Sequence, residues 1–238
     1  LCIKSDLFMH IFALLPPITH FFHSALEYLS DTIGPVIREI MISKKSAEVD
    51  PTRLEKNDDI KKNWKVLKAF TSSLIDAIFK SADRVPLPLQ AVFSHLRTAC
   101  ASQWPMDSVV GFTSVAGFIF LRLFVAATLN PILFGVWPDH ADQRASRTLT
   151  LVAKTLQNLA NLNTFGQKEA FMADMNELIE ERMGGMKAYL ESVSTWTEKK
   201  QKLFAATNKK AVDMKVRGEG EEKGKGRGKE GESDWKVP

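Results

Sequence analysis

The sequence predicts an all-α fold, in which an irregular multi-helix domain is followed by a disordered C-terminal tail. Apolar residues recur every three or four positions through most of residues 25–198, which is the spacing of buried helical faces. No segment of useful length alternates apolar and polar residues, as a half-buried strand would. With 238 residues, of which 45% are hydrophobic, the chain can build one sizeable core.

The first clear helical pattern covers residues 63–79. Its apolar positions share one face and are Trp64, Leu67, Phe70, Leu74, Ile75 and Ile78. The polar residues 57–59 offer N-cap oxygens just before it, and Pro86 and Pro88 mark its end. A second helix follows, with its apolar side at Leu89, Val92, Phe93, Leu96 and Cys100.

The most apolar segment covers residues 107–129 and ends before Pro131. Between residues 108 and 129 the only charge is Arg122, and the length is enough to cross a membrane. An arginine at the centre of a bilayer costs about 2.5–3.5 kcal/mol even on the most lenient scale. The alternatives are a membrane-spanning helix and a helix buried at the centre of a helical domain, and we favour the buried helix.

Three further helices are predicted after a connecting loop at residues 130–145, which contains Pro131, Gly135 and Pro138. The first covers residues 147–162 and has an apolar stripe at Leu149, Val152, Ala153, Leu156, Leu159 and Ala160. The other two cover residues 167–182 and 183–195, and the pair Gly184-Gly185 is predicted to separate them.

The last 40 residues differ in composition from the rest of the chain. Residues 199–238 hold 12 Lys and Arg against 7 Asp and Glu, so the overall charge of +4 belongs to this segment. Its run of Gly, Lys and Glu lacks apolar residues that could repay the entropy of ordering, which predicts a basic disordered tail. Contact between this tail and an acidic membrane surface is a secondary possibility. Since residues 1–198 are close to neutral, we expect no nucleic-acid partner.

The sequence lacks the usual motifs of catalysis and metal binding. It contains no phosphate-binding GxxxxGK[ST] loop, GxSxG elbow, HExxH motif or CxxC pair. The two cysteines, Cys2 and Cys100, show no pairing pattern, which fits a reducing intracellular compartment. We therefore expect no cofactor and no metal, and we do not expect an enzyme that acts alone.

Three ordered segments carry a resemblance to a known family. They are EYLSDTIGPVIREI (27–40) with EVDP (48–51), FLRLFVAATLNPILFG (120–135), and RTLTLVAKTLQNLANLNTFGQKEAFM (147–172). Together they resemble the Ras GTPase-activating domain, over residues 25–198 and in the family's order. The resemblance implies the C-terminal two-thirds of that all-helical domain, which leaves residues 1–24 unassigned.

The resemblance implies a regulator that binds a Ras-type small GTPase in its GTP-bound form and promotes GTP hydrolysis, down-regulating Ras signalling. Such a protein activates the GTPase in trans, and GTP and Mg²⁺ belong to the partner. Arg122 is similar to the family arginine that braces the finger loop. The positions similar to the GTPase-binding groove are Lys154, Gln157, Asn161 and Lys168. A cytoplasmic location is implied, with the inner face of the plasma membrane as a further site of action.

Two departures from the family pattern separate two hypotheses. The family's Pro-Ala pair is replaced by Ala126-Ala127. The segment where the family carries its catalytic finger arginine, before Glu27, contains no arginine at all. In the first hypothesis, the finger lies in a segment that this sequence does not include, and the chain is a fragment or has an altered start at Leu1. In the second hypothesis, the domain binds the GTPase without activating it.

Overall fold

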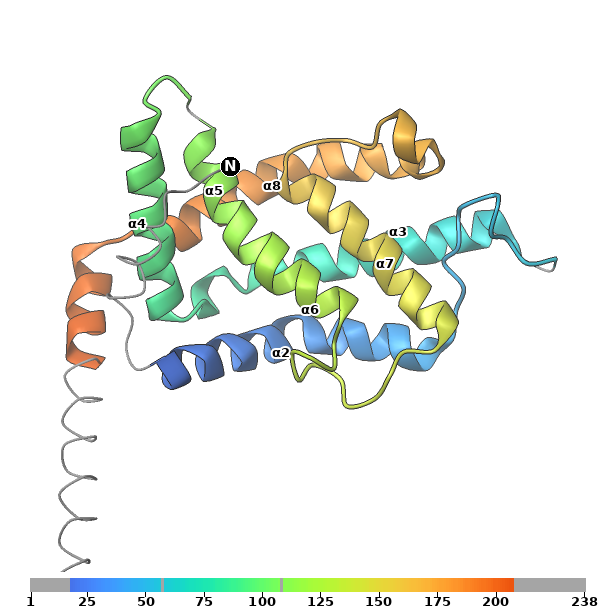
Figure 1. Cartoon of the computed structure of the whole chain (residues 1–238), viewed down its shortest axis with the longest axis horizontal. Coiled ribbons are helices and arrows are strands. Elements are labelled where there is room, and N and C mark those ends of the chain that lie inside the picture. The colour runs from blue at the N-terminus through green and yellow to red at the C-terminus, as the bar shows by residue number, and fades with distance from the viewer. Residues whose placement is uncertain (1–17, 57, 108, 208–238) are drawn as a thin grey trace, which may run out of the picture. The chain divides into compact units, whose positions relative to one another are not determined.

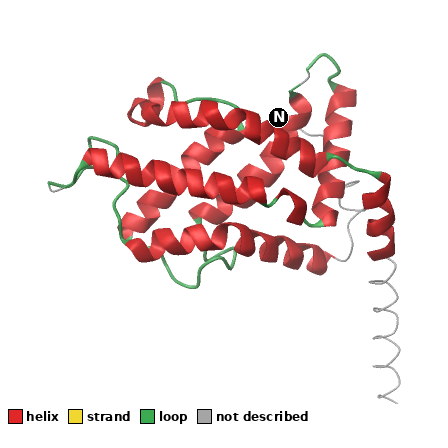
Figure 2. Ribbon diagram, turned by 180° about the vertical axis from the view of Figure 1, so that it is seen from behind, coloured by secondary structure: helices red, strands yellow, loops and turns green. Residues whose placement is uncertain are grey.

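The computed structural model describes residues 18–56, 58–107 and 109–207, and these residues form helices joined by loops, with no strand among them (Figures 1 and 2). In chain order the elements are α2 (Ile18–Ser43), α3 (Ile60–Lys80), η1 (Ala82–Arg84), α4 (Leu87–Gln103), α5 (Val110–Ala116), η2 (Gly117–Phe124), α6 (Val125–Leu129), α7 (Gln143–Ala160), η3 (Gln167–Met175) and α8 (Asn176–Ser194). The predicted all-α fold is confirmed.

The chain divides into two compact units after Trp196. In the second unit, residues 198–207 form a helix, so the first part of the predicted tail is helical. The rest of that tail, 208–238, lies outside the described residues. At the other end, α2 already begins at Ile18, within the stretch predicted as unassigned, and residues 1–17 also lie outside the described residues.

Capping side chains set the ends of two helices more sharply than periodicity does. Asp59 precedes α3, and its carboxylate accepts hydrogen bonds from the backbone of Lys61 and Lys62. Asp142 does the same for α7, where it accepts from the backbone of Ala145 at 2.7 Å. The predicted loop at 130–145 is therefore shorter than expected, because α7 begins directly after Asp142.

The apolar segment from Val110 to Leu129 is one continuous helix made of α5, η2 and α6, with a π-type winding in η2. Its length and composition would allow it to cross a membrane, but more than half of its most apolar window is buried inside the domain. It packs against α4, α7, α8 and α2. Its largest fully buried side chains are Ile119, Phe120 and Phe124. These contacts favour the buried-helix alternative.

Aromatic side chains join this helix to α2 and α8. Phe120 packs edge-on against Tyr189 with ring centroids 5.7 Å apart, and Phe124 lies 5.9 Å from Tyr28. The Tyr28 hydroxyl is within hydrogen-bond distance of Ser81 Oγ (2.6 Å) and of the Tyr189 hydroxyl (3.0 Å). Burial raises the pKa of both tyrosines, so both stay neutral and the network stays hydrogen-bonded.

The predicted break at Gly184-Gly185 is wrong, because α8 runs without interruption from Asn176 to Ser194. Within this helix a glycine serves close packing against a neighbouring side chain and does not mark a turn of the chain. A Cβ atom on Gly185 would lie 2.7 Å from Cε2 of Phe79, whereas one on Gly184 would meet nothing within 4 Å. The interruption in this part of the chain lies earlier, where η3 ends at Met175 and α8 begins at Asn176.

These adjacent glycines should respond in opposite directions to the same substitution. Gly185→Ala is expected to lower the free energy of unfolding by about 1 kcal/mol, because overpacking costs more than the gain in helix propensity. The Phe79 ring cannot move freely, since it stacks on Tyr189 at 5.9 Å. Gly184→Ala is expected to raise the free energy of unfolding by about 0.5–1 kcal/mol. Urea unfolding of both variants tests this, and a shift of the same sign in both would contradict the packing argument.

Candidate functional site

Helix α7 is enclosed on most sides and keeps one open polar face. It packs against α2, α3, α6, η2 and α8 through its buried side chains. The side chains on the open face follow three-and-four spacing and are Gln143, Arg147, Thr150, Lys154, Gln157 and Asn161. Three of the four predicted groove residues, Lys154, Gln157 and Asn161, thus share one continuous strip of surface.

The strip ends at a tight turn that reverses the chain. The backbone N–H of Leu162 donates to the carbonyl of Leu159, and that of Asn163 donates to the carbonyl of Asn158. These two bonds form a Schellman C-cap. Leu162 occupies the left-handed position of this cap, with φ of 55°, where glycine is the usual residue. The turn directs the chain into η3, which carries the fourth predicted residue, Lys168.

Two contacts hold the returning segment in place. The Asn176 side chain accepts from the backbone N–H of Phe165 at 2.7 Å and donates to its carbonyl at 3.1 Å. Glu169 of η3 forms an ion pair with Lys154 of α7. Because both side chains of that pair are about one-third exposed, it lies at the surface of the strip. Lys168 beside it is exposed.

Arg122 lies in η2, the element that packs along α7, and its side chain is exposed. Its Nη1 donates to the backbone carbonyl of Gly117 at 2.9 Å, five residues earlier in the same helix. A guanidinium carries five N–H donors, so the bond to Gly117 leaves capacity to bind another backbone segment. The exposed position of Arg122 is compatible with the bracing role that the resemblance implies, and that role stays a prediction.

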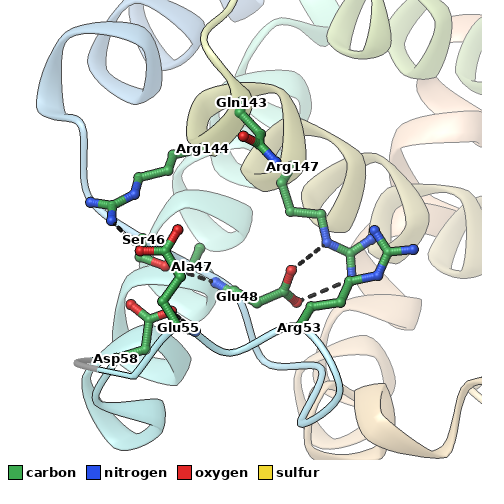
Figure 3. A pocket seen from close by; sticks show the side chains of 9 residues that line it. All are labelled: Ser46, Ala47, Glu48, Arg53, Glu55, Asp58, Gln143, Arg144 and Arg147. Atoms are coloured by element: carbon green, nitrogen blue, oxygen red, sulfur yellow. Dashed lines mark hydrogen bonds and ion pairs between the residues drawn. The ribbon is translucent and has the colours of Figure 1, made fainter.

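A second charged cluster fixes the start of α7 to the loop before α3 (Figure 3). The carboxylate of Glu48 accepts from Nε of Arg147 at 2.6 Å and from its Nη2 at 3.1 Å. The same carboxylate accepts from the backbone N–H groups of Val49 and Asp50, both at 3.0 Å. Its side chain is only 9% exposed. We call this arrangement the Glu48 clasp.

A cavity of about 350 Å³ adjoins the clasp and is lined by Ser46, Ala47, Glu48, Arg53, Glu55, Asp58, Gln143, Arg144 and Arg147. Each arginine that lines the cavity forms an ion pair with a nearby carboxylate. Arg144 bonds Glu55 at 2.6 Å, and Arg53 lies 3.8 Å from Asp50, whose pKa is lowered mainly by its hydrogen bonds from Thr52. The cavity therefore joins the loop to α7 and presents little unbalanced charge to a ligand.

The described residues contain no group of three or more His, Cys, Asp and Glu side chains that could hold a metal ion. The site instead consists of a polar strip on α7, an exposed arginine on η2, and an exposed lysine on η3. Such a polar and charged surface can dock a protein.

Sequence reasoning missed two residues that shape this surface. Glu169 pairs with Lys154 across 15 positions, and Arg147 pairs with Glu48 across 99. Neither of these sequence separations is a periodic spacing within one helix. The pattern of the sequence alone therefore could not show that these residues form pairs. Glu48, Arg147 and Glu169 all lie within the segments that resemble the family, which was the available signal.

Comparison with known proteins gives the family. Residues 55–161 match the family model described as GTPase-activator protein for Ras-like GTPase. The chain is 47% identical over 171 residues to the probable Ras GTPase-activating-like protein ngap of Dictyostelium discoideum, covering 71% of this chain and 20% of that protein. It is 37% identical over 175 residues to Ras GTPase-activating protein 1 of Homo sapiens, covering 74% and 17%.

A third relative, RAS protein activator like-3 of Homo sapiens, is 38% identical over 170 residues, covering 71% of this chain and 16% of that protein. The chain thus spans a fifth or less of the length of these three relatives. The matched residues run from the last part of the loop before α3 to the end of α7, and they include Arg122 and all six residues of the polar strip. The chain therefore contains a domain of the Ras GTPase-activator family.

Proposed function

We propose that this domain binds a Ras-type small GTPase in its GTP-bound form and promotes GTP hydrolysis in trans, which lowers Ras signalling. The observation that carries the proposal is the polar strip of α7, which an ion pair between Lys154 and Glu169 joins to η3. Arg122 is exposed on η2, an element that packs against α7. A charged, solvent-facing strip on an otherwise enclosed helix suits a polar protein partner. GTP and Mg²⁺ belong to that partner, and the domain brings no cofactor.

Each predicted residue has a distinct task in this proposal. Gln157 and Asn161 offer hydrogen-bond donors and acceptors at the open end of the strip, and Lys168 offers a positive charge to an acidic surface. Lys154 is held by Glu169, so it positions the η3 segment as well as contributing charge. Arg122 braces the backbone of the finger loop with its remaining donors, and so acts as a positioning residue.

A second candidate function is a domain that binds the GTPase without activating it. The specific observation is that the first arginine in the sequence is Arg38, after the YL…GP segment that the family's finger precedes. Without an inserted arginine, the charge that develops on the transferred phosphoryl group lacks its counter-ion. For Ras with its activating protein, such an arginine is worth about 10³–10⁵ in rate.

Single-turnover GTP hydrolysis separates the two functions. A Ras-type GTPase loaded with GTP is mixed with excess chain, either unchanged or carrying Arg122→Ala. Acceleration by orders of magnitude supports the activator, and Arg122→Ala should then reduce the rate by up to about 10²-fold, because a small misplacement of the catalytic geometry has that effect. Binding of the GTP-loaded form with no acceleration supports the second function. Lys187→Ala on the exposed surface of α8 is the matched control.

A further inference from the structure

The first half of α3 carries a strongly basic surface that the proposed function does not use. Within Ile60–Lys80 the first acidic residue is Asp76, and four lysines precede it: Lys61, Lys62, Lys65 and Lys68. Three of them are exposed and Lys68 is partly exposed. Among the described residues only Lys68 has an acidic partner, Glu177 at 3.5 Å, whose own side chain is 77% exposed. We call these four residues the lysine stripe.

The stripe opposes the stability of its own helix. The positive end of the helix dipole lies at the start of α3, where acidic side chains are favoured and lysines are not. Lys61 and Lys65 are four positions apart, and Lys65 and Lys68 are three apart, which are the spacings at which like charges repel. Asp59 offsets part of this cost by capping the helix. A local cost of this kind is expected where a surface serves binding.

The stripe borders an open groove that also contains an aromatic residue. The groove has a volume of about 590 Å³ and is lined by Lys61, Trp64, Lys65, Lys68, Ala173, Asp174 and Glu177. Trp64 is half-buried, packed against the core and open to the groove. Asp174 and Glu177 stand on the opposite wall, where Glu177 neutralises Lys68. The wall formed by α3 therefore remains positive, and the beginnings of α3 and α8 lie at the same end of the domain (Figure 1).

We propose that the lysine stripe and Trp64 bind anionic lipid headgroups at a bilayer surface. Clustered lysines on one side of a helix are attracted to acidic lipids, and tryptophan favours the boundary between headgroups and acyl chains. The groove is open to solvent, which suits a surface of headgroups better than an enclosed small molecule. Residues 1–198 are near neutral in total with the stripe included, which disfavours an extended nucleic-acid track.

Vesicle co-sedimentation of the full chain tests this proposal. The probes are vesicles of neutral phosphatidylcholine with and without phosphatidylserine, at low and high salt. Lys61→Ala with Lys65→Ala is expected to lower the partition coefficient on phosphatidylserine vesicles about 30-fold at low salt, since each lysine near an anionic surface contributes about fivefold. The effect should shrink at high salt. The basic segment 199–238 is present in every sample, so its contribution cancels.

The matched control is Lys80→Ala with Lys187→Ala, which removes the same charge from exposed lysines outside the groove. The control pair should bind vesicles almost as well as the unchanged chain. The stripe variant should also melt at the same or a higher temperature, because it relieves repulsion in α3, so weaker binding cannot come from unfolding. An equal loss in both pairs, or no loss in the stripe variant, overturns the proposal. Unchanged vesicle binding with weaker GTPase binding assigns the stripe to the GTPase instead and also overturns it.

Discussion

Glu48→Ala is expected to lower the free energy of unfolding by about 3 kcal/mol. The Glu48 carboxylate is nearly buried and accepts two hydrogen bonds from Arg147 and two from the backbone. Its removal leaves the Arg147 guanidinium, whose side chain is 20% exposed, without its main counter-ion. Breaking one partner of a buried pair costs about 3–5 kcal/mol, and the nearby Asp50, 3.7 Å from Arg147, keeps the cost at the lower end. Urea unfolding measures the change.

The same two elements supply a matched control for the Glu48 clasp. Glu55 and Arg144 also join the loop before α3 to the start of α7, at 2.6 Å, but both side chains are more than half exposed. Glu55→Ala should leave the unfolding midpoint almost unchanged, because solvent-exposed ion pairs are screened. If both variants destabilise the domain equally, the contribution of the Glu48 clasp to the free energy of unfolding does not come from its burial.

Phe120→Ala is expected to lower the free energy of unfolding by about 3–5 kcal/mol in detergent-free buffer. The Phe120 side chain is fully buried and contacts the rings of Phe124 and Tyr189, at 5.5 and 5.7 Å between centroids. Truncation to alanine removes buried apolar area and leaves a cavity between η2 and α8. The change is measured as a lower denaturant midpoint with an unchanged slope.

Leu129→Ala is the control for Phe120→Ala, because it lies in the same continuous helix with a side chain that is 51% exposed. This variant should lose less than about 1 kcal/mol, since surface positions rarely cost more. The comparison also decides between the two interpretations of residues 107–129. A membrane-spanning helix would place both side chains in lipid, and the large difference between the two variants in a soluble sample would then be absent.

Helix type and order were predictable from periodicity, and the start of α3 was predictable from its N-cap residues, whereas the start of α8 was not. The apolar stripes of α3 and α7 depend on local spacing, which the sequence displays directly. The break placed at Gly184-Gly185 failed because glycine also permits close packing, here against Phe79. That contact joins residues about 100 positions apart, which no local pattern reveals. Tertiary packing thus overrode a local signal.

In the candidate site, too, some features could be predicted from the sequence and others could not. The shared face of Lys154, Gln157 and Asn161 follows from helical spacing and was predictable. The exposure of Arg122 was not, because its segment is among the most apolar in the chain and predicts burial. The structure places the charged head on the outer side of η2, away from the buried Phe120 and Phe124. The ion pair between Lys154 and Glu169 depends on the reversal at Leu162, which periodicity cannot indicate.

The most direct test of the proposed docking surface is a binding titration of the chain against one Ras-type GTPase loaded either with a non-hydrolysable GTP analogue or with GDP. We predict measurable binding that is stronger for the GTP analogue, that weakens in Lys168→Ala and Gln157→Ala, and that Lys187→Ala leaves unchanged. A folded chain that binds neither form, or that binds both equally and tolerates Lys168→Ala and Gln157→Ala, would contradict the assignment of the α7 strip as the GTPase-binding surface.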